Sequence, residues 1–204
     1  MGLKPLLCTL ACALACALAL SGCLQEPPGP ATERPASDPQ PVVREADVER
    51  RVHDDVQAER RRRGLRPYRW REDLARTARD HSRDMVRGGY FAHVSPDGRT
   101  PTDRATAHGV RCRTQTSRGR TLEGVSENLF RSWLFSGYQT WTQDGESWRT
   151  YDWRSSADLA REAVGGWLDS RSHREALLDA DSQAHGIGVA IGSDGVVLVT
   201  QVMC

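Results

Sequence analysis

The sequence has little net charge and no apolar run long enough to cross a membrane. Its formal charge is +1 over 204 residues, so no overall electrostatic attraction draws it to nucleic acid, and we expect no nucleic-acid partner. The longest uncharged apolar run covers residues 6–20. At about 15 residues it is shorter than the roughly 20 that a transmembrane helix needs, and it suits the hydrophobic part of a signal peptide.

The sequence also lacks a recognisable nucleophile motif. Residues 124–128 read GVSEN, which omits the final glycine of a nucleophile elbow, and the preceding residues offer no clear oxyanion motif. This absence argues against hydrolysis through a covalent intermediate.

The N-terminus has the pattern of a targeting segment. Lys4 precedes the apolar run, and residues 20–23 read LSGC, which resembles a bacterial lipobox. We therefore predict a lipoprotein signal peptide over residues 1–22 and lipidation of the Cys23 thiol. A simple secretory signal with an incidental cysteine, or an uncleaved anchor, is the alternative. The predicted location is extracytoplasmic, anchored by lipid to a membrane of a bacterial cell envelope.

Residues 23–43 are predicted to be a lipid-anchored linker. Prolines are dense there and large apolar side chains are almost absent, so the segment cannot bury enough surface to offset the entropy of ordering. Proline stiffens such chains towards polyproline II, which would hold a domain away from the membrane. Residues 44–204 then form a single domain of ordinary size.

The six cysteines fall into separate groups. Cys8, Cys12 and Cys16 lie in the predicted signal peptide and Cys23 in the lipobox, which leaves Cys112 and Cys204. An even pair in an exported domain favours a disulfide, with two free thiols as the alternative. Neither cysteine has a neighbour at metal-ligand spacing.

Hydrophobic periodicity predicts helices before strands. Valines at 48, 52 and 56 mark one face of a helix over 45–63, and a second helix covers 72–87. Short helices are expected at 101–107 and 173–178, and a longer one begins after a Ser155 or Ser156 cap. Strands are expected at 123–130, 186–191 and 196–202, the last two joined by a hairpin turn. This order indicates an α+β fold in one domain.

The stretch from residue 131 to 155 fits neither pattern. It is rich in tryptophan and tyrosine without a helical period, and it exceeds common connection lengths. We interpret it either as a packed insert or as a loop that lines a functional site.

Two separated motifs carry a family resemblance. Residues 91–96 read FAHVSP and 126–129 read SENL; residues 167–174 read WLDSRSHR and 200–204 read TQVMC. Over about residues 45–204 the chain resembles the bacterial form of the CAP superfamily, also called the SCP domain. The resemblance implies an α-β-α sandwich with a central antiparallel sheet, and a cleft lined by His93 and Glu127.

His173 belongs to the bacterial form of the second motif, so the resemblance implies a ligand or metal site of His93, Glu127 and His173. Eukaryotic relatives have two histidines and two acids. Here Ser170, or its neighbour Asp169, stands in place of the second acid, and Leu198 stands in place of their second histidine. Zinc is the metal that two imidazoles and one carboxylate would take, and the same set suits acid/base chemistry.

Other histidines are interpreted as structural. His81 falls on the apolar face of a predicted helix and is expected in the core, whereas His53, His108 and His185 are expected at the surface.

The leading functional hypothesis is a membrane-anchored module that binds a lipid, a cell-wall component or a peptide. The alternative is a metal-dependent or acid/base hydrolase that uses the same cleft, and catalytic residues are left unassigned. A purely adhesive or scaffold protein, in which none of the three site residues has a role, is the third hypothesis.

Overall fold

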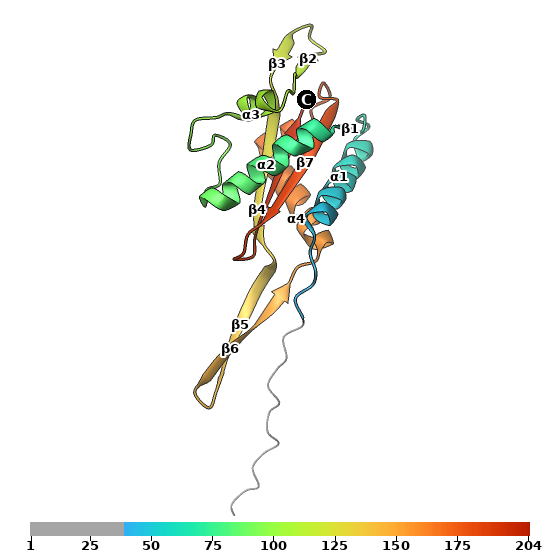
Figure 1. Ribbon diagram of the computed structural model, residues 1–204. Helices are drawn as coiled ribbons and strands as arrows, with labels where there is room; N and C mark the ends of the chain where they lie inside the picture. The colour runs from blue at the N-terminus through green and yellow to red at the C-terminus, as the bar shows by residue number, and fades with distance from the viewer. Residues whose placement is uncertain (1–38) are drawn as a thin grey trace, which may run out of the picture. The chain divides into compact units, whose positions relative to one another are not determined.

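The computed structural model describes residues 39–204 (Figure 1). The predicted signal peptide, Cys23 and most of the linker lie outside these residues. No helix within residues 39–204 is long and apolar enough to cross a membrane. The helices are α1 Glu45–Arg62, α2 Glu72–Gly88, α3 Pro101–Ala107, α4 Ser156–Asp169 and α5 Arg171–Leu177. The strands are β1 Arg69–Trp70, β2 Arg113–Gln115, β3 Thr121–Glu123, β4 Ser126–Trp133, β5 Phe135–Gln143, β6 Glu146–Trp153, β7 Ala184–Ile191 and β8 Val196–Met203.

A four-stranded sheet in the order β1-β7-β8-β4 forms the centre of the domain. The three long strands are antiparallel, as predicted, and the two-residue β1 adds to β7 in parallel. β4, from the middle of the chain, therefore pairs with the C-terminal strand β8, with Ser126 opposite Met203 and Trp133 opposite Val196. This pairing brings the SENL motif beside the TQVMC motif.

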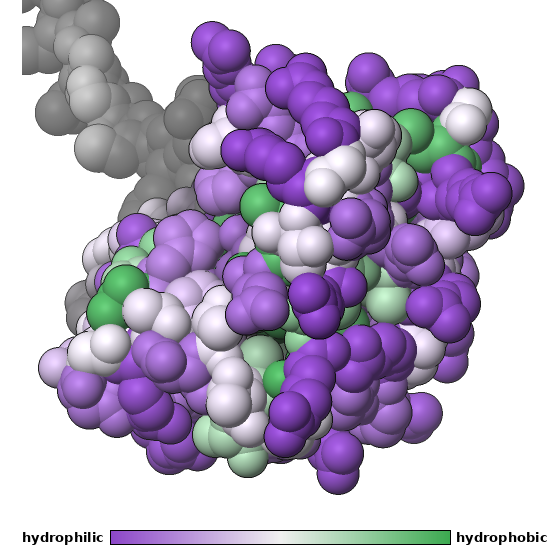
Figure 2. All heavy atoms as spheres, turned by 90° about the horizontal axis from the view of Figure 1, so that it is seen from above, coloured by the Kyte–Doolittle hydropathy of each residue, from purple (hydrophilic) through white to green (hydrophobic). Residues whose placement is uncertain are grey.

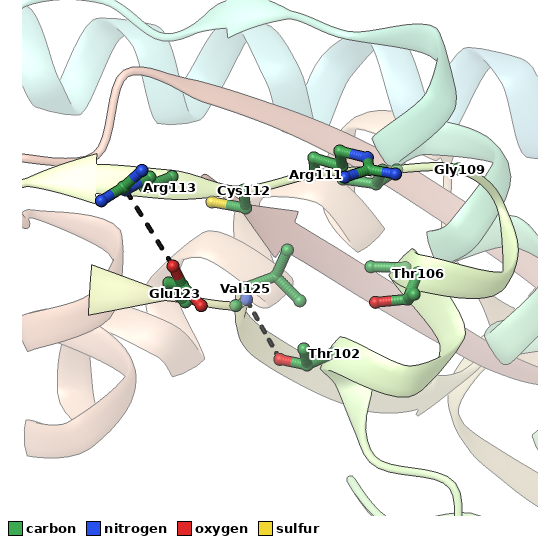
Figure 3. A pocket seen from close by; sticks show the side chains of 11 residues that line it. Thr102, Thr106, Gly109, Arg111, Cys112, Arg113, Glu123 and Val125 are labelled. Carbon is green, nitrogen blue, oxygen red and sulfur yellow. Dashed lines mark hydrogen bonds and ion pairs between the residues drawn. The ribbon is translucent and has the colours of Figure 1, made fainter. Parts of the chain in front are cut away.

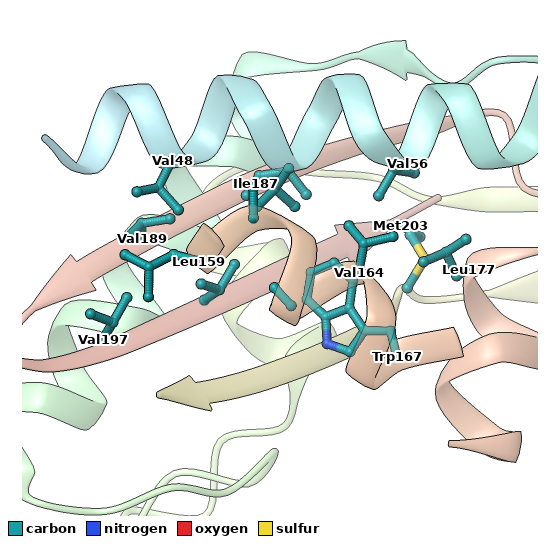
Figure 4. Close-up of a cluster of buried hydrophobic side chains, with 14 of the residues drawn as sticks. Val48, Val56, Leu159, Val164, Trp167, Leu177, Ile187, Val189, Val197 and Met203 are labelled. Carbon is teal, nitrogen blue, oxygen red and sulfur yellow. The ribbon is translucent and has the colours of Figure 1, made fainter. Parts of the chain in front are cut away.

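One face of the sheet is covered by α1, α4 and α5. The α1 valines predicted from their four-residue spacing are fully buried, and they pack in one apolar cluster with side chains of α4, α5 and both C-terminal strands (Figure 4). Trp167 of α4 is 1% exposed and donates from Nε1 to the carbonyl of Leu129, 3.0 Å away. The α4 helix is capped by Ser155, one of the two serines predicted for this role, through a capping box with Asp158.

The other face is covered by α2. Its buried side chains Leu74, Ala78 and Met85 pack on the sheet. Two glycines of β7 allow this close approach: a Cβ on Gly186 would lie 2.1 Å from the backbone N of Ala75, and one on Gly188 would lie 2.0 Å from that of Arg79. The resulting three layers confirm the α-β-α sandwich.

A disulfide joins Cys112 to Cys204, with Cα atoms 5.5 Å apart. It confirms the pairing favoured from the cysteine count. The bridge closes a loop of 92 residues, for which the chain-entropy model gives a stabilisation of about 4 kcal/mol. It also ties the end of β8 to the segment leading into β2.

The aromatic stretch after β4 is a β-hairpin. β5 and β6 pair with each other, separately from the central sheet, and extend away from the domain (Figure 1). Rings of Phe135, Tyr138, Tyr151 and Trp153 contact one another along it. Glu127 lies at the opposite end of β4, about 20 Å from Trp133 at strand spacing, so the hairpin is an ordered insert and does not line the site predicted around Glu127.

Candidate functional site

The centre of the candidate site is the carboxylate of Glu127, near the start of β4. Its side chain is 1% exposed, and both of its oxygens are engaged. Oε1 lies 2.9 Å from Nδ1 of His93, and Oε2 accepts a 2.8 Å hydrogen bond from the guanidinium of Arg104. The structure therefore brings together the first two predicted residues, although 34 positions separate them.

Arg104 is a site residue that the sequence did not reveal. It lies on α3, is 5% exposed, and also donates to the carbonyls of His93 (2.9 Å) and Arg99 (3.0 Å) and to Oγ of Ser95 (3.1 Å). One guanidinium thus neutralises Glu127 and fixes the segment that carries His93. A single arginine on a short helix has no local pattern that distinguishes it from a surface cation, so only the fold identifies it.

His173, on α5, joins the site from the opposite side. Its ring centroid is 6.3 Å from that of His93, with the ring planes at 47°. The Nδ2 group of Asn128, next to Glu127, donates to the carbonyl of His173 at 3.1 Å and so positions α5. Burial lowers the pKa of His173, and the nearby imidazole of His93 lowers it further. The neutral form of His173 is therefore favoured.

His81 is buried on α2, as predicted, but it also touches the site. Its Nε2 lies 3.0 Å from the carbonyl of Ala92 and 3.8 Å from Oε1 of Glu127, while its Nδ1 has no hydrogen-bond partner among the described residues. Burial lowers the pKa of His81, although the charge of Glu127 opposes that shift. A neutral imidazole donating from Nε2 to Ala92 closes the inner wall of the site.

These contacts define the chemistry available. Since Glu127 accepts from Nδ1–H of His93, we assign the tautomer of neutral His93 that leaves a lone pair on Nε2. The His93 side chain is 47% exposed, unlike the buried carboxylate behind it. A fixed imidazole of this kind can accept a proton or a hydrogen bond from a bound molecule.

The same contacts bear on the predicted metal set. One oxygen of Glu127 is hydrogen-bonded to His93 and the other to Arg104. Two imidazoles remain as available ligands, fewer than the three protein ligands of a catalytic zinc site. Among the described residues no group of three or more His, Cys, Asp or Glu side chains is placed to hold a metal ion. The residues as arranged do not fit a zinc centre, so no step is derived through a metal.

Ser170 lies at the junction of α4 and α5. Its hydroxyl is 3.5 Å from that of Ser172, and it has no hydrogen bond to His93, Glu127 or His173 among the described contacts. It is close to the site in sequence but does not replace the second acid of the eukaryotic pattern.

A buried chain of polar groups runs from the site across the sheet. Asn128 donates to Oε1 of Gln201 at 3.2 Å, Nε2 of Gln201 lies 3.0 Å from Nδ1 of His185, and Nε2 of His185 lies 2.7 Å from Nδ1 of His53. The surface prediction for His185 is wrong: it is fully buried on β7, facing α1. The glycines that follow it gave no indication of this, because its burial depends on how α1 packs.

Desolvation lowers the pKa of His185 to about 3, so this ring is neutral. Nδ1 accepts from Gln201 and Nε2–H then donates to His53, which fixes one tautomer along the chain. His53 is half-buried, and burial lowers its pKa as well.

A cavity of about 620 Å³ lies beside the disulfide (Figure 3). Its lining includes Thr102 and Thr106 of α3, with Arg111, Arg113 and Glu123 from the β2–β3 region. Oγ1 of Thr102 accepts from the N–H of Val125 at 3.2 Å. The cavity thus borders α3, which carries Arg104, and the segment that leads into β4, but the predicted site residues do not line it.

The layered fold, with two imidazoles and a buried carboxylate at one end of β4, defines a CAP-type α-β-α sandwich. The model of the Cysteine-rich secretory protein family, CAP, matches residues 53–203, and the chain belongs to this family. The match extends over both sequence motifs and all four strands of the central sheet.

Two curated relatives come from Bacillus subtilis (strain 168). "Uncharacterized protein YkwD" is 31% identical over 140 residues, covering 69% of this chain and 41% of the relative. "Uncharacterized membrane protein YlbC" is 28% identical over 141 residues, covering 69% of this chain and 31% of the relative. The chain therefore spans less than half the length of these relatives.

Solved structures share the fold. An outer surface protein from Borrelia burgdorferi superposes with a TM-score of 0.55 at 15% identity, covering 79% of this chain and 94% of that one. An extracellular SCP-domain protein from Bacillus anthracis str. Ames gives a TM-score of 0.52 at 24% identity, covering 78% and 41%.

Proposed function

We propose that this protein is an extracytoplasmic, membrane-anchored CAP lipoprotein that binds a ligand between His93 and His173. The ligand classes are a lipid, a cell-wall component or a peptide. The observation that carries the proposal is the contrast between a side chain of Glu127 that is 1% exposed and a side chain of His93 that is 47% exposed. Burying a carboxylate is costly unless it is paired, and here its pairing fixes an imidazole that faces solvent.

The N-terminal sequence supports the location. A positive residue, an apolar run and the LSGC tetrapeptide follow one another in register, as in signal peptides with a lipidated cysteine. The relative YlbC is described as a membrane protein. A diacylated Cys23 followed by the proline-rich linker would keep the domain near a membrane surface.

The hydrogen-bonding groups of the site support a ligand with polar groups. In the view of Figure 2 the exposed face is mostly hydrophilic, and apolar residues show only as small separate areas. The site itself offers the imidazole of His93, held by the carboxylate of Glu127, and the imidazole of His173. A ligand that can hydrogen-bond to His93 and His173 matches these groups better than a purely apolar chain does.

A titration experiment tests the proposal. The full-length chain is titrated with anionic lipid vesicles, soluble muropeptides or blocked pentapeptides, while NMR follows the histidine ring signals. A probe of the right class should move the His93 and His173 signals. His93→Gln and His173→Gln should each weaken its binding about tenfold, as expected when a hydrogen bond of about 1.4 kcal/mol is lost.

His108→Gln is the matched control, because this partly exposed histidine pairs with Asp80 and lies outside the site. It should leave binding within about twofold of the wild type. If all three probes leave the His93 and His173 signals unmoved, or bind the His93 and His173 variants as well as the wild type, the proposed site is wrong.

A hydrolase is the second candidate, favoured by the orientation of His93. An imidazole held by a carboxylate through Nδ1 has the geometry of a general base that activates water. If the protein is an enzyme, His93→Gln should lower kcat about 10²–10⁴-fold, while KM changes little. If the wild type turns over no substrate and His93→Gln weakens ligand binding, the binding function alone is supported.

A further inference from the structure

The outer edge of β4 is open along part of its length. β4 is the last strand of the β1-β7-β8-β4 sheet, so β8 pairs with one side of it and no described strand pairs with the other. Exposed strand edges are templates for a further strand, and folded proteins usually cover or block them. The same strand carries Glu127.

The hydrogen-bond register shows which groups point outward. The N–H of Leu134 donates to the carbonyl of Gly195 on the β8 side. In an antiparallel pair the direction alternates from one residue to the next. The N–H and C=O groups of residues 128, 130 and 132 therefore face β8, and those of residues 127, 129, 131 and 133 face away from it.

Two of the outward carbonyls have partners. Nε1 of Trp167 donates to Leu129, and the guanidinium of Arg154 lies 3.4 Å from the carbonyl of Trp133. Both groups of Arg131, between them, have no partner among the described residues. Arg131 is an exposed residue, and its N–H and C=O form a complete outward pair that has no partner among the described contacts.

The side chains beside this edge give it chemical character. Alternation places Arg131 and Trp133 on the same face of β4 as Glu127. The guanidinium of Arg131 lies 5.1 Å from the ring of Phe91 and 5.8 Å from that of Trp133, two rings that are 38% and 43% exposed. The edge thus combines a positive charge with two exposed aromatic rings.

We propose that an extended peptide segment with a central acidic residue pairs with the outer edge of β4 at Arg131. This inference goes beyond the proposed function, because the edge at Arg131 is a second site on the strand that carries Glu127. The residue opposite Arg131 exchanges two backbone hydrogen bonds with it, as in strand addition.

The side chain of the paired residue lies on the same face as the guanidinium of Arg131, which favours a carboxylate by charge. A pentapeptide whose central residue lies opposite Arg131 covers residues 129–133 of β4, whereas Glu127 lies four residues, about 13 Å, from Arg131. A lipid tail or a glycan has no N–H and C=O pair at this spacing, and the open edge offers it nothing specific.

The test uses the full-length chain and the blocked pentapeptide Ac-Ser-Val-Glu-Val-Ser-NH2. Its glutamate should lie opposite Arg131, and NMR should show shifts at the amides of Leu129, Arg131 and Trp133. The same peptide with an N-methyl group on the glutamate cannot donate to the Arg131 carbonyl and should bind at least about tenfold more weakly. This comparison needs no change to the protein.

Two variants separate backbone from charge. Arg131→Pro removes the outward N–H without touching the β4–β8 ladder, and proline is tolerated at strand edges; it should weaken binding about tenfold. Arg131→Ala keeps the backbone groups and should weaken only peptides that carry the glutamate, by about threefold. The Glu→Gln version of the peptide should show no effect of Arg131→Ala.

Equal binding of the parent and N-methylated peptides would overturn the inference. So would shifts confined to other elements, or sedimentation showing that two copies of this chain pair through β4. If muropeptides or vesicles bind in a manner that depends on His93 but not on Arg131→Pro, the proposed function stands and the edge inference fails. If the pentapeptide binds at the edge while His93→Gln and His173→Gln leave every probe unaffected, the proposed function fails instead.

Discussion

The two ends of β4 lie in contrasting environments, one buried and one exposed to solvent. At its first end Glu127 is buried, and its carboxylate is paired with Arg104 and His93. At its last end the chain leaves the sheet and continues into a two-stranded hairpin whose rings contact mainly each other, with Tyr138 50% exposed. The same strand thus joins a buried, hydrogen-bonded region to a hairpin that makes few contacts with the rest of the domain.

The difference indicates at which end of β4 substitutions should lower the stability of the domain. A buried charge requires its partners, so the arrangement around Glu127 persists only if α3, the segment carrying His93 and β4 assemble together. An isolated two-stranded hairpin is marginal in water, so β5 and β6 depend on the domain more than the domain depends on them. We expect substitutions at the first end to cost stability and those at the second end to cost little.

The largest expected effect is that of Arg104→Met. This change removes the cation that faces Glu127 and three further hydrogen bonds to the segment of residues 93–99. Removing one partner of a buried ion pair costs about 3–5 kcal/mol. Urea denaturation should therefore show a large fall in the free energy of unfolding, and the histidine NMR signals should show that His93 is no longer fixed.

A second substitution shows whether the cost comes from the unpaired charge. Glu127→Gln in the Arg104→Met background removes that charge and should restore part of the lost stability, a non-additive result of the kind expected for residues in contact. Arg99→Met, at an exposed arginine of the same segment, should leave the urea midpoint unchanged. Strict additivity of the two substitutions would mean that Glu127 and Arg104 are not coupled.

The sequence predicted the residues of the candidate site only where they stand in motifs. His93, Glu127 and His173 stand in recognisable motifs, and the structure brings their elements together. Arg104 and His185 stand in no motif, and their burial depends on the packing of α3 against β4 and of α1 against β7. The valines of α1 and the Ser155 cap were predictable because their signals are local and periodic.

The structure of the aromatic hairpin could not be predicted from its sequence pattern. Its strands alternate poorly, because both faces of an uncovered ribbon meet solvent, so the usual period-two pattern of a half-buried strand is missing. Density of tryptophan and tyrosine alone did not decide between an insert and a wall of the site. The direction of β4 decides it, and that direction follows from pairing with β8.

An intermediate effect is expected for pH. The pKa of His185 is about 3 in the folded chain, against about 6.5 when unfolded. The unfolded chain therefore binds a proton first as pH falls, so this contribution to stability is complete above pH 6.5 and is lost progressively below it. The loss is about 1.4 kcal/mol per pH unit.

The variant His185→Gln isolates the contribution of His185 to the pH dependence of the free energy of unfolding. It keeps hydrogen-bonding groups between Gln201 and His53 but cannot take up a proton. Between pH 6.5 and 5 the free energy of unfolding of the wild type should fall more steeply than that of the variant, by about 1.4 kcal/mol per pH unit. Parallel curves would show that His185 does not stay neutral on folding and that the assigned tautomer chain is incorrect.

The smallest effect is expected at the hairpin. Removing residues 139–150 and joining Tyr138 to Tyr151 through Asn-Gly retains the base, where Phe135, Tyr151 and Trp153 border Val43 and Ile191, and closes it with a favoured two-residue turn. Because the removed strands pair mainly with each other, urea denaturation should show a change within about 1 kcal/mol. Native-state hydrogen exchange should already show fast exchange for these amides and slow exchange for β4 and β8. A loss above about 2 kcal/mol would place the hairpin within the cooperative unit of the domain, and the two ends of β4 would then differ in exposure but not in their contribution to stability.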